Sequence, residues 1–311
     1  MVVQVISFYN NSFGHSLFNG ATTLSGVTQI DVGNFDVNNE DAILKQLHLK
    51  LDERQARIFI DTTEYEAHLC KENEETAYGW HVLFSKTLSA YASSRGIRVI
   101  RLSTFAVFDG SSYEPYVESD EANAKTVYGN TMQEGEYELL SNNPNAIVVR
   151  LPWVYSAFYK SNFVYKLIEA MFHHEELYVF DDQVGNLCNL FDLQQMLYHI
   201  IDCLVCDDVS ISDSDDVTDR IYHLSPKGFC SKFEIAEEIW RTFSKLFSSN
   251  LKTKNIIPVP SKETNDDAQA NCCISSRRFL INFKKAMPDW HFSLYNATQK
   301  AIKSIGNISS D

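Results

Sequence analysis

The sequence predicts an α/β fold, a doubly wound parallel sheet with a smaller C-terminal α/β lobe. Short apolar runs alternate with helical patterns through the first half of the chain, which is typical of a parallel sheet covered on both faces. The length of 311 residues suits one large unit or two unequal lobes, and 44% apolar residues supply a core of that size. The alternation weakens after residue 174, so we expect the rest of the chain to contribute a second lobe.

The expected elements follow the chain in order. Apolar runs bounded by turn residues predict strands at 2–8, 27–32, 57–63, 97–108 and 146–155. Periodic apolar positions predict helices at 40–51, 77–96, around Tyr128, and at 162–174, 193–208 and 231–247. Ser231, with Glu234 three residues later, is placed to cap the last of these helices. The acidic stretch 208–219 has no periodicity and predicts a surface insertion.

Composition and the N-terminal pattern exclude two kinds of partner. The formal net charge of −14 argues against nucleic acid, because phosphate-backbone contacts need clustered Lys and Arg. The N-terminal stretch has no basic segment before its apolar run, and no stretch reaches the roughly 18 apolar residues that a membrane span needs. We therefore expect a cytoplasmic protein with neither nucleic acid nor membrane as partner.

The cysteines predict neither disulfides nor a metal site. The chain has 7 of them, an odd and scattered set that is typical of reduced thiols. Cys203 and Cys206 form a CxxC, but no second pair of ligands stands at zinc spacing. Because both lie in an apolar helical pattern, we expect them to be small buried hydrophobic residues.

The turn after the first strand is where a doubly wound fold binds a dinucleotide, through a glycine-rich turn that lets the pyrophosphate approach the backbone. In FYNNSFGHSL only Gly14 is present where three glycines are wanted. Asn11 can still form the turn, but Phe8 and Asn11 carry side chains where the phosphates would lie. The sequence thus leaves open whether NADP or NAD binds.

Several motifs together resemble one family. These are LSTFAVFDG at 102–110, PYVESD at 115–120, VYGNTMQEGE at 127–136, VVRLPWVYS at 148–156, SNF, VFDDQVG and MPDWHF. In this order and spacing the chain resembles the dTDP-4-dehydrorhamnose reductases of the extended short-chain dehydrogenase class, together with their non-catalytic relatives, the regulatory β subunits of methionine adenosyltransferase. The resemblance implies NADPH-dependent reduction of a 4-keto nucleotide sugar. It also implies a Rossmann-like domain, here 1–155, and a mainly substrate-binding lobe, here 156–311, with the chain free to cross back.

The resemblance assigns catalytic positions. Hydride delivery to a ketone leaves an alkoxide that needs a proton, which a tyrosine hydroxyl can give. Tyr128 matches this acid, and Thr104, with Ser103 beside it, matches the hydroxyl that orients the carbonyl. The class places a lysine one turn after the tyrosine to favour the phenolate and hold the nicotinamide ribose. Met132 stands there instead.

Other cofactor-facing positions also depart from the family. Asp61 with Thr62 and Thr63 replaces an Asn-Ala-Ala and is expected to add negative charge near an anionic cofactor. Gly14 and Asn11 remain the candidate turn residues. Asp36 matches an acidic position near the adenosine end, although an Asp before a helix is as often a cap.

The sugar-nucleotide positions are better kept. Trp153 matches the aromatic residue that packs on the sugar, Asn162 matches a substrate-contacting Asn, and Gln183 with Gly185 matches the loop that closes on it. Trp153 could equally be structural, and Trp290 is assigned to packing.

Two functional classes follow from this pattern. The first is a non-catalytic nucleotide-sugar-binding or regulatory subunit, with a nucleotide sugar or a protein as partner and a homodimer left open. The second is an active NAD(P)H-dependent 4-keto-6-deoxy nucleotide-sugar reductase. We favour the first, and expect Phe8, Phe105 and Met132 to project into the space that a cofactor would fill.

Overall fold

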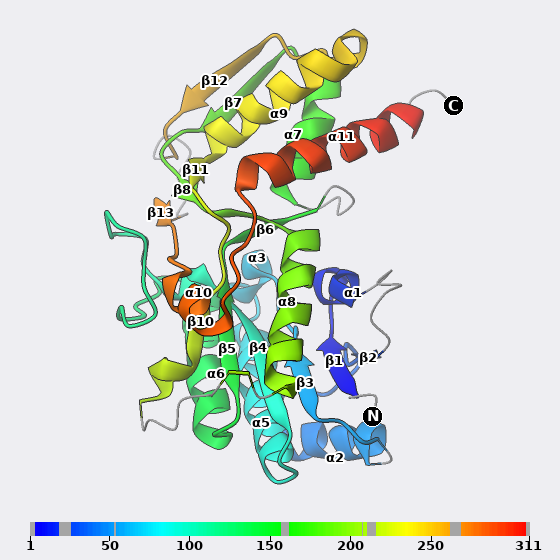
Figure 1. The fold of residues 1–311 in the computed structure, drawn as a ribbon, viewed down its shortest axis with the longest axis vertical. Coiled ribbons are helices and arrows are strands. Elements are labelled where there is room, and N and C mark those ends of the chain that lie inside the picture. Colours follow the sequence, from blue (N-terminus) through cyan, green and yellow to red (C-terminus); the bar gives the residue numbers. More distant parts are fainter. Residues whose placement is uncertain are drawn as a thin grey trace.

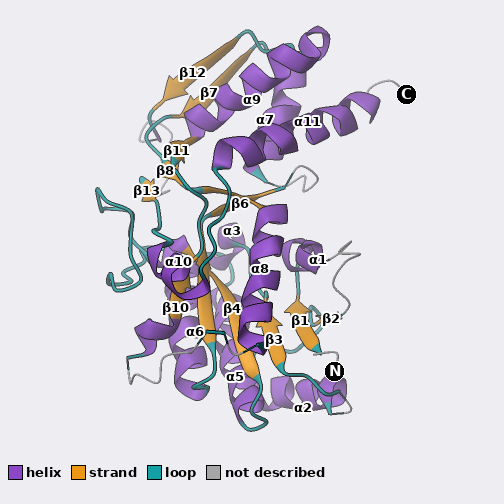
Figure 2. Cartoon of the chain, viewed as in Figure 1, coloured by secondary structure: helices purple, strands orange, loops and turns teal. Residues whose placement is uncertain are grey.

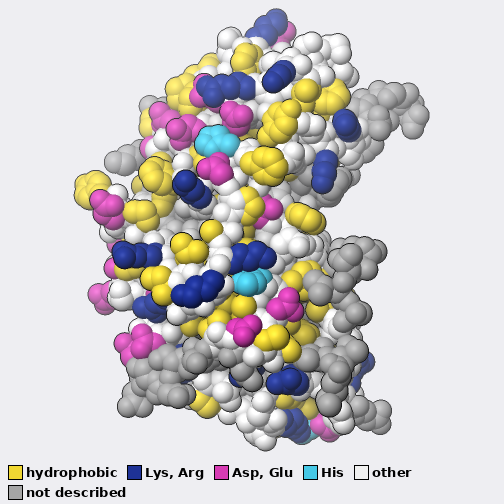
Figure 3. All heavy atoms as spheres, viewed as in Figure 1, with side chains coloured by type: hydrophobic (Ala, Val, Ile, Leu, Met, Phe, Trp, Pro, Cys, Tyr) yellow, Lys and Arg dark blue, Asp and Glu magenta, His cyan; other side chains and the backbone are white. Residues whose placement is uncertain are grey.

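The computed structural model describes residues 4–18, 26–52, 54–156, 162–206, 208–209, 216–261 and 269–308. The molecule is elongated, with a large sheet-containing lobe at one end and a smaller lobe at the other (Figure 1). The smaller lobe contains helices α7 (Phe163–His173), α9 (Lys232–Phe247) and α11 (Trp290–Ile308). Acidic and basic side chains are interspersed over the face seen in Figure 3.

Six parallel strands form the main sheet, in the order β10-β5-β4-β3-β1-β2. Their bounds are β1 Val5–Tyr9, β2 Val27–Asp31, β3 Ile58–Asp61, β4 Arg98–Thr104, β5 Ile147–Leu151 and β10 Ile221–His223. The order reverses direction at β1, next to β3, which is the doubly wound topology that the alternating pattern predicts. The predicted fold class is confirmed.

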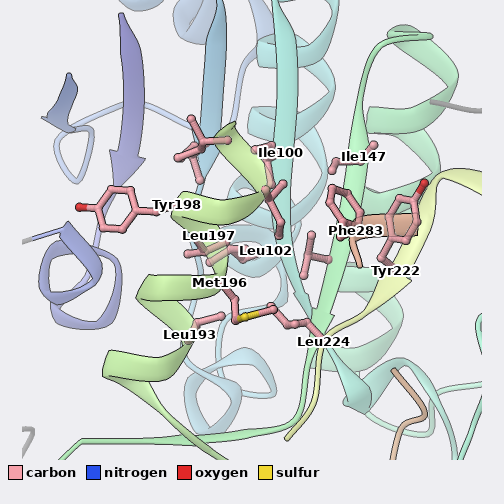
Figure 4. Packing of buried hydrophobic residues seen from close by; sticks show 14 of the residues in the cluster. Ile100, Leu102, Ile147, Leu193, Met196, Leu197, Tyr198, Tyr222, Leu224 and Phe283 are labelled. Atoms are coloured by element: carbon pink, nitrogen blue, oxygen red, sulfur yellow. The ribbon is translucent and has the colours of Figure 1, made fainter. Parts of the chain in front are cut away.

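Helices cover both faces of this sheet (Figure 2). One face packs on α2 (Glu40–Leu51), α5 (Phe84–Ser93) and α6 (Val127–Asn142). The other packs on α1 (Ser12–Phe18), α8 (Leu190–Val205) and α10 (Arg277–Phe283). Figure 4 shows Leu193, Met196 and Leu197 of α8 facing Ile100 and Leu102 of β4. Because side chains along a strand alternate between the two faces of the sheet, consecutive residues of a strand pack into different hydrophobic cores, one on each face.

The remaining elements are short. α3 (Ala67–Cys70), α4 (Glu74–Tyr78) and the π-helical turn η1 (Gly79–Leu83) precede α5. The 3₁₀ turns are η2 (Phe105–Val107), η3 (Val217–Arg220) and η4 (Ser248–Asn250). The predicted helix at 77–96 is therefore interrupted by a π turn, and it terminates before Gly96, whose φ is 66°. The capping box of Ser231 and Glu234 at the start of α9 is confirmed.

The predicted strand 146–155 is wrong as a single element. It splits at Pro152 into β5 and β6 (Trp153–Tyr155), and β6 pairs in parallel with β9 (Leu187–Asn189) outside the main sheet. A proline has no N–H to continue a ladder, so the chain can leave the sheet there. This departure carries Trp153 away from the main sheet.

The smaller lobe has its own core. β7 (Glu176–Phe180) pairs in parallel with β12 (Asn255–Val259), and β8 (Val184–Gly185) lies between β11 (Cys230–Ser231) and β13 (Asn271–Cys272). Trp290 is 4% exposed in this core, so its predicted packing role is confirmed. Strand β10 and helices α8 and α10 follow residue 155 in sequence but pack with the large sheet. The boundary at residue 155 stays a prediction.

No helix among the described residues combines the length and the apolar character needed to cross a membrane.

Candidate functional site

A cleft of about 730 Å³ lies at the carboxyl ends of the sheet strands, between the two lobes. This edge is where open parallel sheets bind ligands. We call its two walls the sheet half and the lobe half. The sheet half comprises Asn11, Phe13, Thr62–Glu64, Glu66–His68, Leu102–Ala106, Thr126, Tyr128, Met132, Leu151 and Pro152. The lobe half comprises Trp153–Tyr155, Asn162–Val164, Lys166, Gln183, Leu187, Lys232, Gln269 and Cys272.

Tyr128 reaches the sheet half from the first turn of α6. Thr126 caps this helix by accepting a hydrogen bond from the N–H of Gly129, at 3.1 Å. The Tyr128 hydroxyl donates to Oε1 of Glu64 at 2.6 Å. Burial and the neighbouring Glu64 carboxylate raise the pKa of Tyr128 well above its ordinary value, against a smaller lowering by a hydrogen bond from Thr104. The acid position is therefore occupied, but its hydroxyl points at a carboxyl group.

Glu64 is the residue of the sheet half that the sequence analysis missed. Its N–H donates to Oδ1 of Asn10 at 3.0 Å, and its carbonyl accepts from Nδ2 of Asn11 at 3.4 Å. The next N–H, of Tyr65, donates to Nε2 of His81 at 2.9 Å. Burial raises the pKa of the Glu64 carboxyl. The two asparagines that replace turn glycines thus hold the loop that carries Glu64 to Tyr128.

Met132 lies one turn after Tyr128, with 2% exposure. Its sulfur is 3.6 Å from Nη2 of Arg101, a fully buried residue of β4. Nη1 of Arg101 forms an ion pair with Asp61 at 2.5 Å. A lysine at position 132 would therefore meet a like charge in a low-dielectric site.

The pairing of Asp61 corrects one expectation. Asp61 is fully buried, and besides Arg101 its carboxylate accepts from Ser85 at 2.9 Å and from the Thr63 hydroxyl at 2.7 Å. Asp61 does not line the cleft. The expectation that it adds negative charge near a cofactor is therefore wrong. Glu64 and Glu66 supply the negative charge instead.

Ser103 and Thr104 both reach the cleft wall at the end of β4, but their hydroxyls differ. The Ser103 hydroxyl donates to Glu136, whose carboxylate forms a buried ion pair with Arg150 at 2.7 Å. Thr104 accepts from the N–H of Ala106 at 3.1 Å, and it acts to lower the pKa of Tyr128. Thr104 is thus the hydroxyl that accompanies the tyrosine, and Ser103 belongs to a buried polar network.

Phe8 is not in the cleft, and its predicted projection into the cofactor's space is wrong. It is fully buried, with its ring centroid 5.2 Å from that of Phe59 and 6.3 Å from that of Phe84. Alternation along β1 directs it under α5 rather than toward the strand end. Phe105 and Met132 do line the cleft, as predicted.

The remaining turn residues have structural partners. Oδ1 of Asn11 accepts from the N–H of Gly14 at 2.9 Å. A Cβ at Gly14 would lie 2.3 Å from Oγ1 of Thr62, so this glycine permits close packing of α1. Asp36 is exposed, accepts from the N–H of Asn38 at 3.2 Å and does not line the cleft, and Asn39 is the cap of α2. The acid at the end of β2 is Asp31, beside Tyr9 in register.

The lobe half contains the predicted sugar-nucleotide residues. Trp153 lies against Gly185, where a Cβ would be 3.0 Å from the indole Cε2. Gln183 lines the cleft with 1% exposure. Asn162 caps α7 by accepting from the N–H of Tyr165 at 3.0 Å, and its Nδ2 donates to the carbonyl of Ser156 at 2.8 Å. Trp153, Asn162 and Gln183 therefore meet in one wall, with Gly185 behind the indole.

Lys232, the first residue of α9, is a second residue that the sequence analysis missed. Its Nζ lies 5.9 Å from the ring centroid of Trp153, and 5.6 Å from those of Phe163 and Phe180. The only sequence signal nearby is the capping pair of Ser231 and Glu234, and the aromatic neighbours of Lys232 come from three other segments.

Three features of the sheet half oppose the binding of a dinucleotide. A bound NAD(P) would supply a hydride, and its pyrophosphate and nicotinamide ribose need free N–H groups and a cation. Here the N–H of Gly14 is taken by Asn11, the lysine position holds a methionine, and the charged groups of this wall are Glu64 and Glu66.

No group of three His, Cys, Asp or Glu side chains able to hold a metal was found within the described ranges. Cys203 is buried in α8, as predicted, whereas Cys206 is exposed at the end of that helix. The expectation that both are buried is therefore wrong for Cys206.

Comparisons with known proteins agree on one family. Residues 9–302 match the model of the RmlD substrate binding domain. The chain is similar to a dTDP-4-dehydrorhamnose reductase of Sinorhizobium fredii, at 31% identity over 67% of this chain and 68% of the relative. It is also similar to the reductase of that name from Aggregatibacter actinomycetemcomitans, at 25% identity over 87% and 88%.

Solved structures extend the similarity to the whole fold. A dTDP-4-dehydrorhamnose reductase from Clostridium acetobutylicum has a TM-score of 0.78 at 25% identity, covering 95% of this chain and 99% of that one. One from Bacillus anthracis, solved in complex with NADP, has a TM-score of 0.79 at 22% identity, covering 96% and 99%.

Proposed function

Because the chain belongs to the dTDP-4-dehydrorhamnose reductase family, we propose that it is a non-catalytic member that binds a nucleotide sugar in the lobe half of the cleft and serves as a regulatory subunit. As a regulatory subunit, it would act by binding a protein partner. Relatives named as reductases raise the alternative that this chain also reduces a keto sugar, and the chemistry of the sheet half argues against it.

The single observation that carries the proposal is the hydrogen bond from Tyr128 to Glu64, at 2.6 Å. A tyrosine acts as a general acid when a nearby cation favours its phenolate. Here a carboxyl group lies in hydrogen-bond contact, and both burial and that carboxyl raise the pKa of Tyr128. The hydroxyl proton is directed at Glu64 and is harder to release than in an ordinary tyrosine.

A second observation supports the same conclusion. The Glu64 loop is held by Asn10 and Asn11, the residues of the turn that would receive the pyrophosphate. A dinucleotide would have to displace these bonds and sit beside the carboxyl groups of Glu64 and Glu66. The lost hydrogen bonds and the electrostatic repulsion of phosphate at this wall therefore oppose cofactor binding, independently of the catalytic step.

The alternative, an active reductase, is favoured by one feature. Thr104 and Tyr128 line the same cleft, and they match two of the three groups that ketone reduction uses. In that case Tyr128 would have to release its proton even though burial and Glu64 raise its pKa.

Turnover separates the two functions. The full chain is incubated with NADPH or NADH and dTDP-4-dehydrorhamnose, and cofactor absorbance is followed. We expect the native chain to oxidise cofactor no faster than Tyr128→Phe, with Tyr137→Phe, an exposed tyrosine of the same helix, as the control. Turnover by the native chain and by Tyr137→Phe that Tyr128→Phe abolishes would establish the reductase instead.

A further inference from the structure

Charge is segregated across the cleft. Glu64 and Glu66 are the carboxylates among its described lining residues, and both come from the loop that follows β3. Lys166 and Lys232 are the lysines among them, and they come from α7 and α9 of the smaller lobe. An anionic group entering the cleft is therefore repelled by one wall and attracted by the other.

Lys232 is the better placed of the two lysines. It is half-buried, whereas Lys166 is exposed on the rim. The rings of Trp153, Phe163 and Phe180 surround its ammonium at 5.6–5.9 Å. Ring faces attract a cation and exclude water, so they hold the side chain in place and leave its charge less screened than that of a surface lysine.

The residues next to Lys232 fit the rest of a nucleotide sugar. Trp153 offers an aromatic face to a sugar or base, and Gln183 lies in the same wall. Gly185 leaves no side chain behind the indole, where a Cβ would be 3.0 Å away. A ligand that packs on Trp153 therefore brings its phosphates within reach of the Lys232 ammonium.

Resting on the proposed function, we propose that Lys232 is the residue that binds the diphosphate of the nucleotide sugar, and that it makes the cleft select a nucleoside diphosphate over a nucleoside. The charge of the diphosphate is neutralised at the lobe half, across the cleft from Glu64. The β1–α1 turn, where a dinucleotide fold usually binds phosphate, takes no part.

The test is calorimetric titration of the full chain with dTDP, dTMP and thymidine at low and at moderate salt. We expect Lys232→Met to weaken dTDP binding at least tenfold, about 1.4 kcal/mol, and to change thymidine binding less than twofold. Lys232→Arg, which keeps the charge, should stay within about threefold of the native chain for dTDP. Lys245→Met, an exposed lysine in the last turn of the same helix, is the matched control and should change nothing.

Salt dependence gives a second readout. The affinity of the native chain for dTDP should fall as salt rises, and that of Lys232→Met should fall less steeply, because one ion contact is missing. Equal dTDP affinity in native and Lys232→Met chains overturns the inference alone, whereas a native chain that does not bind dTDP at all overturns both the inference and the nucleotide-sugar binding on which it rests. Neither result depends on cofactor oxidation, so failure here is distinct from the appearance of reductase activity, which would overturn the proposed function.

Discussion

The sheet half and the lobe half of the cleft face each other but carry opposite charges. The sheet half presents Glu64 and Glu66, and the buried Arg101 behind this wall is paired with Asp61. The lobe half presents Lys232 among aromatic rings. In a nucleotide-sugar reductase both walls must accept phosphate, one for the cofactor and one for the substrate. On the proposed function, this chain keeps the arrangement at one wall only, and ligand binding is then separable from hydride transfer in the same cleft.

The largest effect is expected from restoring the missing lysine. Met132→Lys adds a second cation to the buried side chain whose sulfur now lies 3.6 Å from Nη2 of Arg101. We expect a loss of about 3 kcal/mol in the free energy of unfolding, because a buried charge without its own partner is costly. Urea denaturation measures it.

The control is a swap of the two residues. In Arg101→Met combined with Met132→Lys, the new ammonium can pair with Asp61, so at least a third of the lost stability should return. If Met132→Lys alone is as stable as the native chain, Arg101 does not explain the absence of the lysine.

The next prediction concerns the stability of the folded chain at acid pH, through His81, which is buried behind the sheet half. Burial, and then the charge of Arg101, lower the pKa of His81 to about 3. The unfolded chain, in which this imidazole has its ordinary pKa near 6.5, binds the proton first, so stability is full above that pH and is lost as pH falls toward about 3. The loss is about 1.4 kcal/mol per pH unit for one histidine.

His81→Gln should be less stable at pH 7.5, since it loses the bond to Tyr65, but its stability should fall less steeply between pH 6 and pH 4. His223, which burial likewise keeps neutral through a lowered pKa, leaves part of the slope in place. His173→Gln, at the exposed end of α7, is the control. An unchanged slope in His81→Gln would mean that this imidazole is protonated in the folded chain.

In the lobe half, Trp153→Ala should weaken dTDP binding about 30-fold, or about 2 kcal/mol, through loss of the stacking surface. Trp153→Phe should stay within about fivefold. Tyr178→Ala removes an aromatic side chain that is 65% exposed on β7, outside the cleft lining, and should have no effect. Calorimetry at one salt concentration suffices, and unchanged binding by Trp153→Ala would make this tryptophan purely structural.

The smallest effect is expected at Asn11. Asn11→Gly removes the bonds to Gly14 and to the Glu64 carbonyl, at a cost of about 1 kcal/mol. NADPH affinity should rise less than threefold, because the Glu64 carboxyl remains. A tenfold gain in nicotinamide fluorescence titration would assign the obstruction to the turn rather than to Glu64.

Much of the fold was predictable because its signals are local. The alternating pattern predicts the parallel sheet, and Ser231 with Glu234 predicts the start of α9. Trp153 and Tyr128 were found through motifs that survive in the sequence. These residues do reach one cleft, since parallel strands end at a common edge.

The errors arise where the outcome depends on the side-chain environment. The motif alone places Phe8 at the cleft, whereas the alternation of side chains along β1 directs it into the core. Asp61 was counted as a cleft charge because its partner, Arg101, lies 40 residues away. Neither Glu64 nor Lys232 belongs to a recognisable sequence motif. Folding brings Glu64 to Tyr128 and brings Lys232 to three aromatic rings, and neither contact has a local signal in the sequence.

The most direct test of the separation between the two walls is a pair of titrations of the native full-length chain, with NADPH followed by nicotinamide fluorescence and with dTDP followed by calorimetry. The account predicts saturable dTDP binding and no saturable NADPH binding over the same concentration range. It is contradicted if NADPH binds saturably and at least as tightly as dTDP, because the sheet half would then accept the phosphates that Glu64 and Glu66 are expected to repel.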